Sequence, residues 1–167
     1  MGRWPVPYCK RLEPSSHTPE GKSTLSGDGG LAMLLGDLLS LRQLDLPVKL
    51  VVFNNGSLGF VELEMKAARI LDFATDLHNP NCARLAEAAG LLGLRVEDSE
   101  QVKPMIAQAL AHPGPALVDV VVNRQELAMP PTIDVAQAVG FSLYMIRAVL
   151  NGRGDEVIDL ARTNLFR

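Results

Sequence analysis

The chain has few cysteines, few aromatic residues and no block of basic residues, and each shortage excludes a class of protein. Its 2 cysteines among 167 residues have no metal-ligand spacing, so we expect reduced thiols rather than a disulfide framework or a zinc site. A net charge of −3 without a basic block gives no electrostatic basis for binding nucleic acid. No apolar run reaches the roughly 20 residues that span a bilayer, and the N-terminus shows no hydrophobic signal segment, so we expect neither a transmembrane helix nor secretion.

The pattern of apolar residues predicts strands that alternate with helices. A dense apolar stretch over residues 31–44 predicts one helix that is buried on most of its surface, and residues 48–53 predict a strand buried on both faces. The elements predicted after these are helices over 60–71, 81–89 and 99–111, the last with Ser99 as N-cap, and strands over 94–96 and 116–122. This order predicts an α/β fold: a three-layer parallel sheet flanked by helices, with a C-terminal helical tail.

Three segments of different character divide the chain. Residues 1–24 are rich in proline and have no periodicity, so they are interpreted as an irregular lead-in, and we hypothesise that its start is spurious. Residues 22–25 form a poor candidate for the strand that a parallel sheet requires at this point. Residues 25–125 are predicted to form the main domain, and 126–167 a linker and an amphipathic tail.

Two short motifs at the predicted strand ends suggest a site for a cation and a diphosphate. Gly27-Asp28-Gly29-Gly30 and Asn54-Asn55 are separated by the predicted helix and strand. Mg²⁺ prefers oxygen ligands and keeps several for water or phosphate, so the Asp28 carboxylate, the Asn55 amide and a main-chain carbonyl at Ser57 form a plausible set. The glycines allow backbone N–H groups to approach phosphate oxygens. Either motif alone is more often a simple turn, but the pair at this spacing is more specific.

The paired motifs and their surroundings resemble the C-terminal thiamine-diphosphate-binding domain of bacterial pyruvate oxidases and quinone-dependent pyruvate dehydrogenases. The resemblance is carried by SGDGGLAMLLGDLLSLRQLDLPVKLVVFNNGSLGFVELEMK, by LVDVVV and ELAMPP, and by the tail GFSLYMIRAVLNGRGDEVIDLARTNLFR. It implies decarboxylation of pyruvate to acetate and CO₂, with electrons passing through FAD to a quinone. FAD and the activating glutamate would come from domains that this segment does not contain, so we expect no catalytic residue within it and no activity of the segment alone.

The resemblance also implies a role for each motif residue. Asp28 and Asn55 would bind Mg²⁺ through their side chains and Ser57 through its carbonyl. The glycines Gly27, Gly29 and Gly30 would lie against the diphosphate of thiamine diphosphate. The cofactor and substrate pocket would be lined by Leu58, Gly59 and Phe60, although Phe60 is equally compatible with an ordinary core position. Glu62 and Glu64 are interpreted as structural or solvent-facing rather than as an acid–base pair.

The C-terminal segment is amphipathic, and two interpretations remain open. Its apolar side is formed by Val157, Ile158, Leu160, Ala161 and Leu165. Such a helix commonly packs on its own protein or on another subunit. The resemblance favours docking on a membrane that holds the quinone, which gives a cytoplasmic protein peripherally associated with the inner face of the cell membrane. The tail lacks the excess of Lys and Arg that anionic lipids usually attract.

The remaining ionisable residues show no catalytic pattern. His17, His78 and His112 are isolated from one another, and Cys82 is interpreted as a small core residue. The rival functions are a non-catalytic remnant or binding module and a fragment of an acetolactate-synthase-like carboligase. The resemblance further predicts a fragment of a longer enzyme that is a homo-oligomer in its full-length form.

Overall fold

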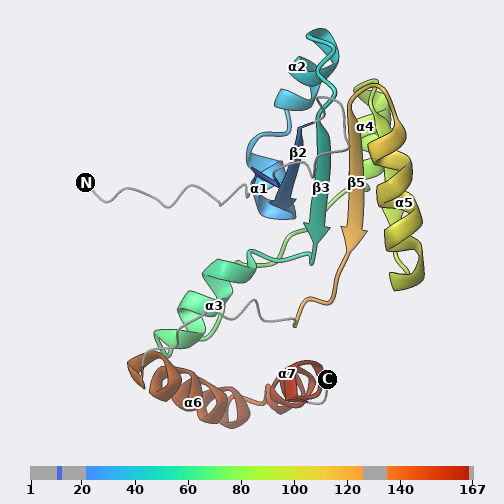
Figure 1. Cartoon of the computed structure of the whole chain (residues 1–167). Helices are drawn as coiled ribbons and strands as arrows, with labels where there is room; N and C mark the ends of the chain where they lie inside the picture. Colours follow the sequence, from blue (N-terminus) through green and yellow to red (C-terminus); the bar gives the residue numbers. More distant parts are fainter. Residues whose placement is uncertain (1–10, 13–21, 126–134, 166–167) are drawn as a thin grey trace. The chain divides into compact units, whose positions relative to one another are not determined.

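The computed structural model describes residues 11–12, 22–125 and 135–165, and the chain forms two compact units (Figure 1). The first unit comprises Met1–Asn55 and His78–Val122, and the second comprises Gly56–Leu77 and Asn123–Arg167. Most of the predicted lead-in and the predicted linker over 126–134 lie outside the described residues. Gly56–Leu77 therefore groups with the C-terminal part of the chain. The sequence analysis included it in the main domain predicted over 25–125.

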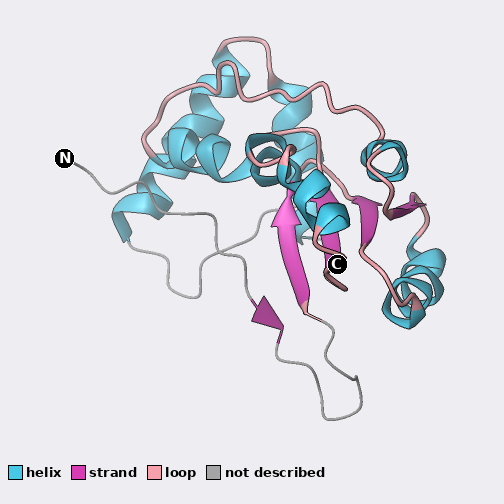
Figure 2. Cartoon of the chain, turned by 90° about the horizontal axis from the view of Figure 1, so that it is seen from above, coloured by secondary structure: helices cyan, strands magenta, loops and turns pink. Residues whose placement is uncertain are grey.

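A five-stranded sheet forms the centre of the first unit. Its strands are ordered β1 (Arg11–Leu12), β2 (Ser23–Gly27), β3 (Lys49–Asn54), β5 (Ala116–Val121) and β4 (Leu92–Val96). The four strands β2, β3, β5 and β4 are parallel, and β1 pairs antiparallel with β2 at the edge. Along the chain, helices lie between the successive parallel strands β2, β3, β4 and β5. Figure 2 draws the strands in magenta and the helices in cyan. The predicted α/β fold with a parallel sheet is therefore confirmed.

Helices cover both faces of this sheet, because successive side chains of the central strand β5 pack into two separate hydrophobic clusters. Leu117 packs in one hydrophobic cluster with residues of α1 (Asp28–Met33), α2 (Asp37–Gln43) and α4 (Cys82–Ala88). Its neighbour Val118 packs in a second cluster with residues of α5 (Ser99–Ala111). Successive side chains of a strand point to opposite faces, so the two clusters are the two sides of one sheet. Burial of a side chain such as Leu117 contributes roughly 1.5–3 kcal/mol.

The helix predicted over residues 31–44 is wrong in length and in burial. The chain forms two short helices, α1 and α2, with a turn at 34–36 between them. Gly36 is a poor helix former, and Asp37 is favoured in the first turn of the helix that follows. Two short helices direct only Leu31 and Leu38 fully into the core. The apolar side chains that remain exposed are Met33, Leu34, Leu35, Leu39 and Leu44.

Four smaller predictions also require correction. Residues 23–27 form strand β2 despite their weak propensity, because pairing with β3 provides a full ladder of parallel partners. The N-cap of α5 is Asp98 rather than Ser99, since the Asp98 side chain accepts a hydrogen bond from the N–H of Glu100 at 3.0 Å. Helix α3 (Gly59–Ala67) ends before the predicted residue 71. Arg69, just after its end, adopts a φ of 66°, which a helix does not allow. Strand β3 is not buried on both faces throughout, because the Phe53 side chain is exposed.

The second unit is helical. It contains α3 together with α6 (Val135–Leu150) and α7 (Gly154–Leu165), which confirms the predicted C-terminal helical tail. Helix α6 packs against α3 so closely that a Cβ atom at Gly140 would lie 2.0 Å from the carbonyl oxygen of Ala67. Tyr144 and Ala148 of α6 are buried. Among the described residues, no helix has the length and apolar character needed to cross a membrane.

Candidate functional site

The sheet register brings the two predicted motifs to one edge. The parallel ladder between β2 and β3 ends with Gly27 beside Phe53. Asp28 directly follows β2. On the neighbouring strand, Asn54 is the last residue of β3 and Asn55 follows it. In open parallel sheets, ligands bind beyond the carboxyl ends of the strands, which is where these residues lie. The predicted placement of the acid and the amides at adjacent strand ends is confirmed.

The Asp28 carboxylate is buried and held by N–H donors. Asp28 is only 4% exposed. Oδ1 accepts a hydrogen bond from the backbone N–H of Gly29 at 2.9 Å, and Oδ2 accepts one from Nδ2 of Asn79 at 2.6 Å. Both of these donors are neutral amides, and they orient the two carboxylate oxygens. The N–H of Gly29 is thus engaged by Asp28, and contact of Gly27, Gly29 and Gly30 with a diphosphate stays a prediction.

Asn54 is the structural member of the asparagine pair. Its Oδ1 accepts a hydrogen bond from Nδ2 of Asn79 at 2.9 Å, and its Nδ2 donates to Oδ1 of Asp119 at 3.0 Å. These contacts use both ends of the buried amide, which fixes its orientation. The next turn is set by Gly56, whose φ of +66° favours glycine. The metal-ligand role of Asn55 stays a prediction that this anchored neighbour supports.

Asp119 lies at the inner end of the same network. It is fully buried in β5, and its Oδ2 accepts hydrogen bonds from the backbone N–H of Cys82 at 3.1 Å and from Arg95 at 2.6 Å. Burial first, and then the negative charges of Asp119 and Asp28, raise the pKa of the Cys82 thiol to about 11. Cys82 is therefore a protonated core residue at neutral pH, as predicted, and not a nucleophile.

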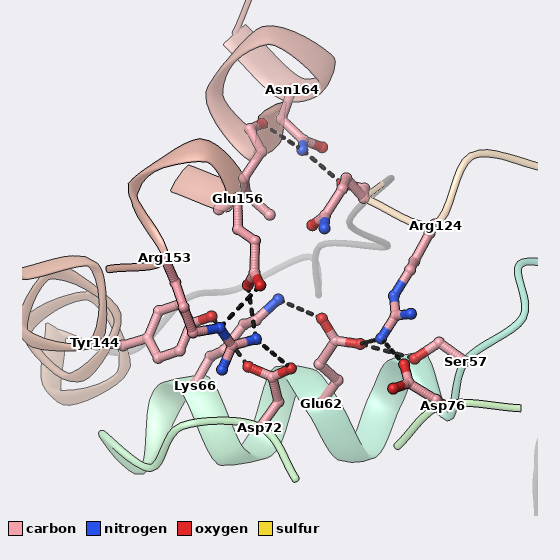
Figure 3. Close-up of polar contacts among 12 residues, drawn as sticks. Ser57, Glu62, Lys66, Asp72, Asp76, Arg124, Tyr144, Arg153, Glu156 and Asn164 are labelled. Atoms are coloured by element: carbon pink, nitrogen blue, oxygen red, sulfur yellow. Dashed lines mark hydrogen bonds and ion pairs between the residues drawn. The ribbon is translucent and has the colours of Figure 1, made fainter. Parts of the chain in front are cut away.

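Ser57, predicted as a metal ligand, and the predicted pocket residues Leu58, Gly59 and Phe60 belong to the second unit. The hydroxyl of Ser57 donates to Oε2 of Glu62 at 2.7 Å, and the Lys66 ammonium lies 2.5 Å from Oε1 of the same carboxylate (Figure 3). Glu62 is buried in this cluster, which agrees with its structural interpretation, while Glu64 is exposed. Phe60 is 74% exposed, so the core position allowed for it is wrong. The roles of Ser57, Leu58, Gly59 and Phe60 toward a ligand stay predictions.

A second ionic cluster in this unit connects the segment after α3 to the C-terminal helices. Arg153 lies 2.8 Å from Oδ2 of Asp72 and 2.7 Å from Oε2 of Glu156, and the Tyr144 hydroxyl donates to Oδ1 of Asp72 at 3.2 Å (Figure 3). Burial acts to raise the pKa of Asp72, but hydrogen bonds and the charge of Arg153 outweigh it, and the pKa lies below its usual value. Here the cation Arg153 lies against both carboxylates.

The first unit supplies a donor set that fits a cation bound together with a diphosphate. One carboxylate (Asp28) and one amide (Asn55) lie at the same edge, next to the glycines of the first turn of α1. The part of the chain that the structure describes contains no group of three His, Cys, Asp or Glu side chains that could hold a metal alone. Mg²⁺ is commonly bound through one or two carboxylates plus phosphate and water oxygens, so the sparse set is compatible with it.

The sequence interpretation missed two residues of this site. Asn79 was not singled out, because a loop asparagine before a proline gives no periodic signal. Asp119 carried a detectable signal, since it is the single charged residue within an apolar strand (ALVDVV) and such a residue requires buried partners. His78 is exposed, and no catalytic role was predicted for it.

Comparison with known proteins identifies the class to which this fold and site belong. Residues 22–120 match the family described as thiamine pyrophosphate enzyme, C-terminal TPP binding domain. The chain therefore belongs to the family of thiamine pyrophosphate enzymes through this domain. A thiamine pyrophosphate-containing protein of Bacillus subtilis (YdaP) is 34% identical over 137 residues, which cover 82% of this chain and 24% of that protein.

Two further comparisons concern one protein of similar sequence and one of similar structure. The mitochondrial acetolactate synthase of Schizosaccharomyces pombe is 33% identical over 107 residues, covering 64% of this chain and 16% of that protein. The crystal structure of benzoylformate decarboxylase from Polynucleobacter necessarius has a TM-score of 0.60 at 24% identity, covering 65% of this chain and 20% of that one. The latter shows the fold alone. The chain spans a quarter or less of the length of each of these proteins.

Proposed function

We propose that this chain supplies the Mg²⁺- and diphosphate-binding part of a thiamine-diphosphate enzyme that decarboxylates pyruvate. The observation that carries the proposal is the placement of Asp28 and Asn54-Asn55 at adjacent carboxyl ends of β2 and β3, within a domain that belongs to the thiamine pyrophosphate enzymes. Thiamine diphosphate, when bound, supplies the electron sink that decarboxylation of a 2-oxo acid requires. The chain's own residues would hold and orient that cofactor.

Each residue of the proposed site has a separate task. Asp28 and Asn55 hold the cation through side-chain oxygens, and Gly29 and Gly30, which have no side chains, leave space for the phosphates. Asn54 contributes indirectly, because its amide is anchored to Asp119 and so keeps the turn that carries Asn55 in place. The carbonyl of Ser57 as a further ligand, and the pocket formed by Leu58, Gly59 and Phe60, are supported only by the resemblance to pyruvate oxidases.

Titration calorimetry with Mg²⁺ and thiamine diphosphate tests the proposal directly. We expect the wild-type chain to bind the pair, and Asp28→Ala to abolish binding because the cation loses its one carboxylate ligand. Asp37→Ala is the matched control, since Asp37 is an exposed acid in the first turn of α2 and should change nothing. A wild-type chain that shows no binding would contradict the proposal and favour a remnant without function.

For the complete enzyme we propose a pyruvate oxidoreductase that passes electrons through FAD to a quinone. The support is the tail from Gly140 to Arg167, which resembles that of the quinone-linked enzymes. The acetolactate synthases among the relatives favour a second candidate, a carboligase. Mass spectrometry of the protein from cells would show the length of the chain that exists there. Incubation of that protein with pyruvate and an artificial electron acceptor separates the two, because oxidation yields acetate and carboligation yields acetolactate.

We further propose that the full-length protein is a cytoplasmic homo-oligomer. Its C-terminal tail would dock on the inner face of the cell membrane. Helices α6 and α7 present exposed apolar side chains, among them Ile146, Val149, Leu150 and Ile158. Their acidic and basic residues are roughly balanced, so the attraction would come from apolar contact more than from charge. Sedimentation with phospholipid vesicles tests this proposal, and a protein that stays in the supernatant with both neutral and anionic lipid would contradict it.

A further inference from the structure

Asn79 connects the two strand ends that carry the proposed metal site. It lies in the loop before α4, and its Nδ2 donates to Oδ2 of Asp28 at 2.6 Å and to Oδ1 of Asn54 at 2.9 Å. A side-chain amide nitrogen has two hydrogens, and these two acceptors use both. Asp28 directly follows β2 and Asn54 is the last residue of β3, so one side chain bridges two neighbouring strands beyond the point where their backbone ladder ends at Gly27 and Phe53.

The bridge has a defined direction and is anchored at both sides. Only the orientation with the nitrogen toward Asp28 and Asn54 satisfies both acceptors, because the flipped amide would place its oxygen against two other oxygens. Asn54 is itself held by the fully buried Asp119. Pro80 restricts the backbone of Asn79 to extended conformations, which limits the positions that its side chain can reach. The hydrogen bond to a carboxylate is short, as expected for a charge-assisted one.

We propose that Asn79 is a positioning residue for the cation, and this inference rests on the proposed function of Asp28. Its amide fixes the direction of the Asp28 oxygens and their distance from the asparagine turn, before any ligand arrives. Carboxylate oxygens accept about four bonds in total, so this contact and coordination of a cation are compatible. Partners that orient a ligating carboxylate typically contribute about 10- to 100-fold to metal affinity.

Titration of Mg²⁺ into the chain in the presence of thiamine diphosphate tests the inference. Asn79→Leu, which keeps the size of the side chain and removes the donor, should weaken Mg²⁺ binding about 10- to 100-fold. Asn79→Gln keeps an amide donor on a longer stem and should recover part of that loss. An Asn79→Leu variant that binds Mg²⁺ within about threefold of wild type, or an Asn79→Gln variant as weak as Asn79→Leu, would overturn the inference.

A neighbouring asparagine provides the control for a merely structural effect. Asn81, in the same loop, caps α4 by accepting a hydrogen bond from the N–H of Arg84 at 3.0 Å. Asn81→Ala should lower thermal stability through the lost cap and leave Mg²⁺ affinity unchanged. If both variants lose affinity in proportion to their loss of stability, Asn79 is a structural residue only and the inference fails.

The outcomes also separate this inference from the proposed function. A wild-type chain that binds no Mg²⁺ with thiamine diphosphate overturns both. A wild-type chain whose binding is abolished by Asp28→Ala and unaffected by Asn79→Leu retains the proposed function and overturns the role of Asn79 alone. Circular dichroism of each variant establishes that it is folded before the titration.

Discussion

The carboxylate of the proposed site in the first unit is held differently from the carboxylates of the second unit. In the first unit, Asp28 accepts hydrogen bonds from a backbone N–H and from the amide of Asn79. In the second unit, Glu62 and Asp72 lie against the cationic groups of Lys66 and Arg153. Amide donors orient a carboxylate and preserve its charge, whereas ion pairs neutralise it. The difference teaches that the first arrangement suits an incoming cation and that the second suits a purely structural connection.

The largest effect on stability is expected at Asp119, a fully buried carboxylate of the first unit that accepts from amides, as Asp28 does, and also pairs with the cation Arg95. Asp119→Ala would remove the acceptor from Asn54, Cys82 and Arg95 at once. Leaving such partners without their buried carboxylate should lower the free energy of unfolding by roughly 3–5 kcal/mol. Chemical denaturation measures the change. Glu97→Ala is the control, because Glu97 is an exposed partner of the same Arg95 and its loss should cost less than about 1 kcal/mol.

A loss near 1 kcal/mol for Asp119→Ala would contradict the role given to the network. It would mean that water or a rearranged Arg95 replaces the carboxylate at little cost. Asn54 would then be held by the sheet and by its hydrogen bond with Asn79.

In the second unit, a close approach between helices should matter more than any single ion pair. A Cβ atom at Gly140 would meet the carbonyl oxygen of Ala67 at 2.0 Å, so Gly140→Ala forces α6 away from α3. We expect a loss of about 1–3 kcal/mol, as for other overpacked sites, together with faster proteolysis of the C-terminal helices. Gly154→Ala is the control, because its Cβ would meet no atom within 4 Å. Equal stability of the two variants would show that α6 packs less tightly than the backbone positions indicate.

The smallest expected effect is a change of stability with pH that depends on Asp72. The pKa of Asp72 lies below its usual value because Arg153 outweighs the effect of burial. Its contribution is therefore complete above the unfolded pKa of about 3.9 and is lost as the pH falls through the lower folded value. Asp72→Asn should lower the free energy of unfolding at pH 6, because it removes the charge that Arg153 pairs with, and the loss should become smaller below about pH 4. Denaturant unfolding across pH 3–6 measures this difference, and a difference that stays constant over the range would contradict the ion pair's role.

The sequence predicted the sheet well and its shortest elements poorly. Strands β3 and β5 were found because their apolar runs are continuous, and such runs follow from burial on both faces of a parallel sheet. Strand β2 was judged weak because Ser23, Thr24 and Ser26 have little apolar character, and only pairing with β3 explains it. The single helix predicted over 31–44 was wrong because density of leucine does not specify which side chains face the core.

The candidate site divides in the same manner. Asp28 and Asn55 could be found from their motifs because glycine and asparagine have strong local preferences in turns. Asn79 could not be found, because it lies 25 positions from Asn54 and 51 from Asp28 and acts only through the space they share. Phe60 could not be assigned between core and pocket by its hydrophobicity, since exposure depends on neighbours that sequence spacing does not reveal.

By itself, the sequence determined the order of strands and helices and the two ligand motifs, because these depend on local periodicity and short-range spacing. The family followed from its resemblance to known proteins. Only the tertiary structure decided that Asn79 and Asp119 complete a hydrogen-bonded chain with Asn54 and Asp28. The physical reason is that these bonds join distant segments at one sheet edge. A hydrogen bond forms only where folding brings donor and acceptor within about 3 Å of each other.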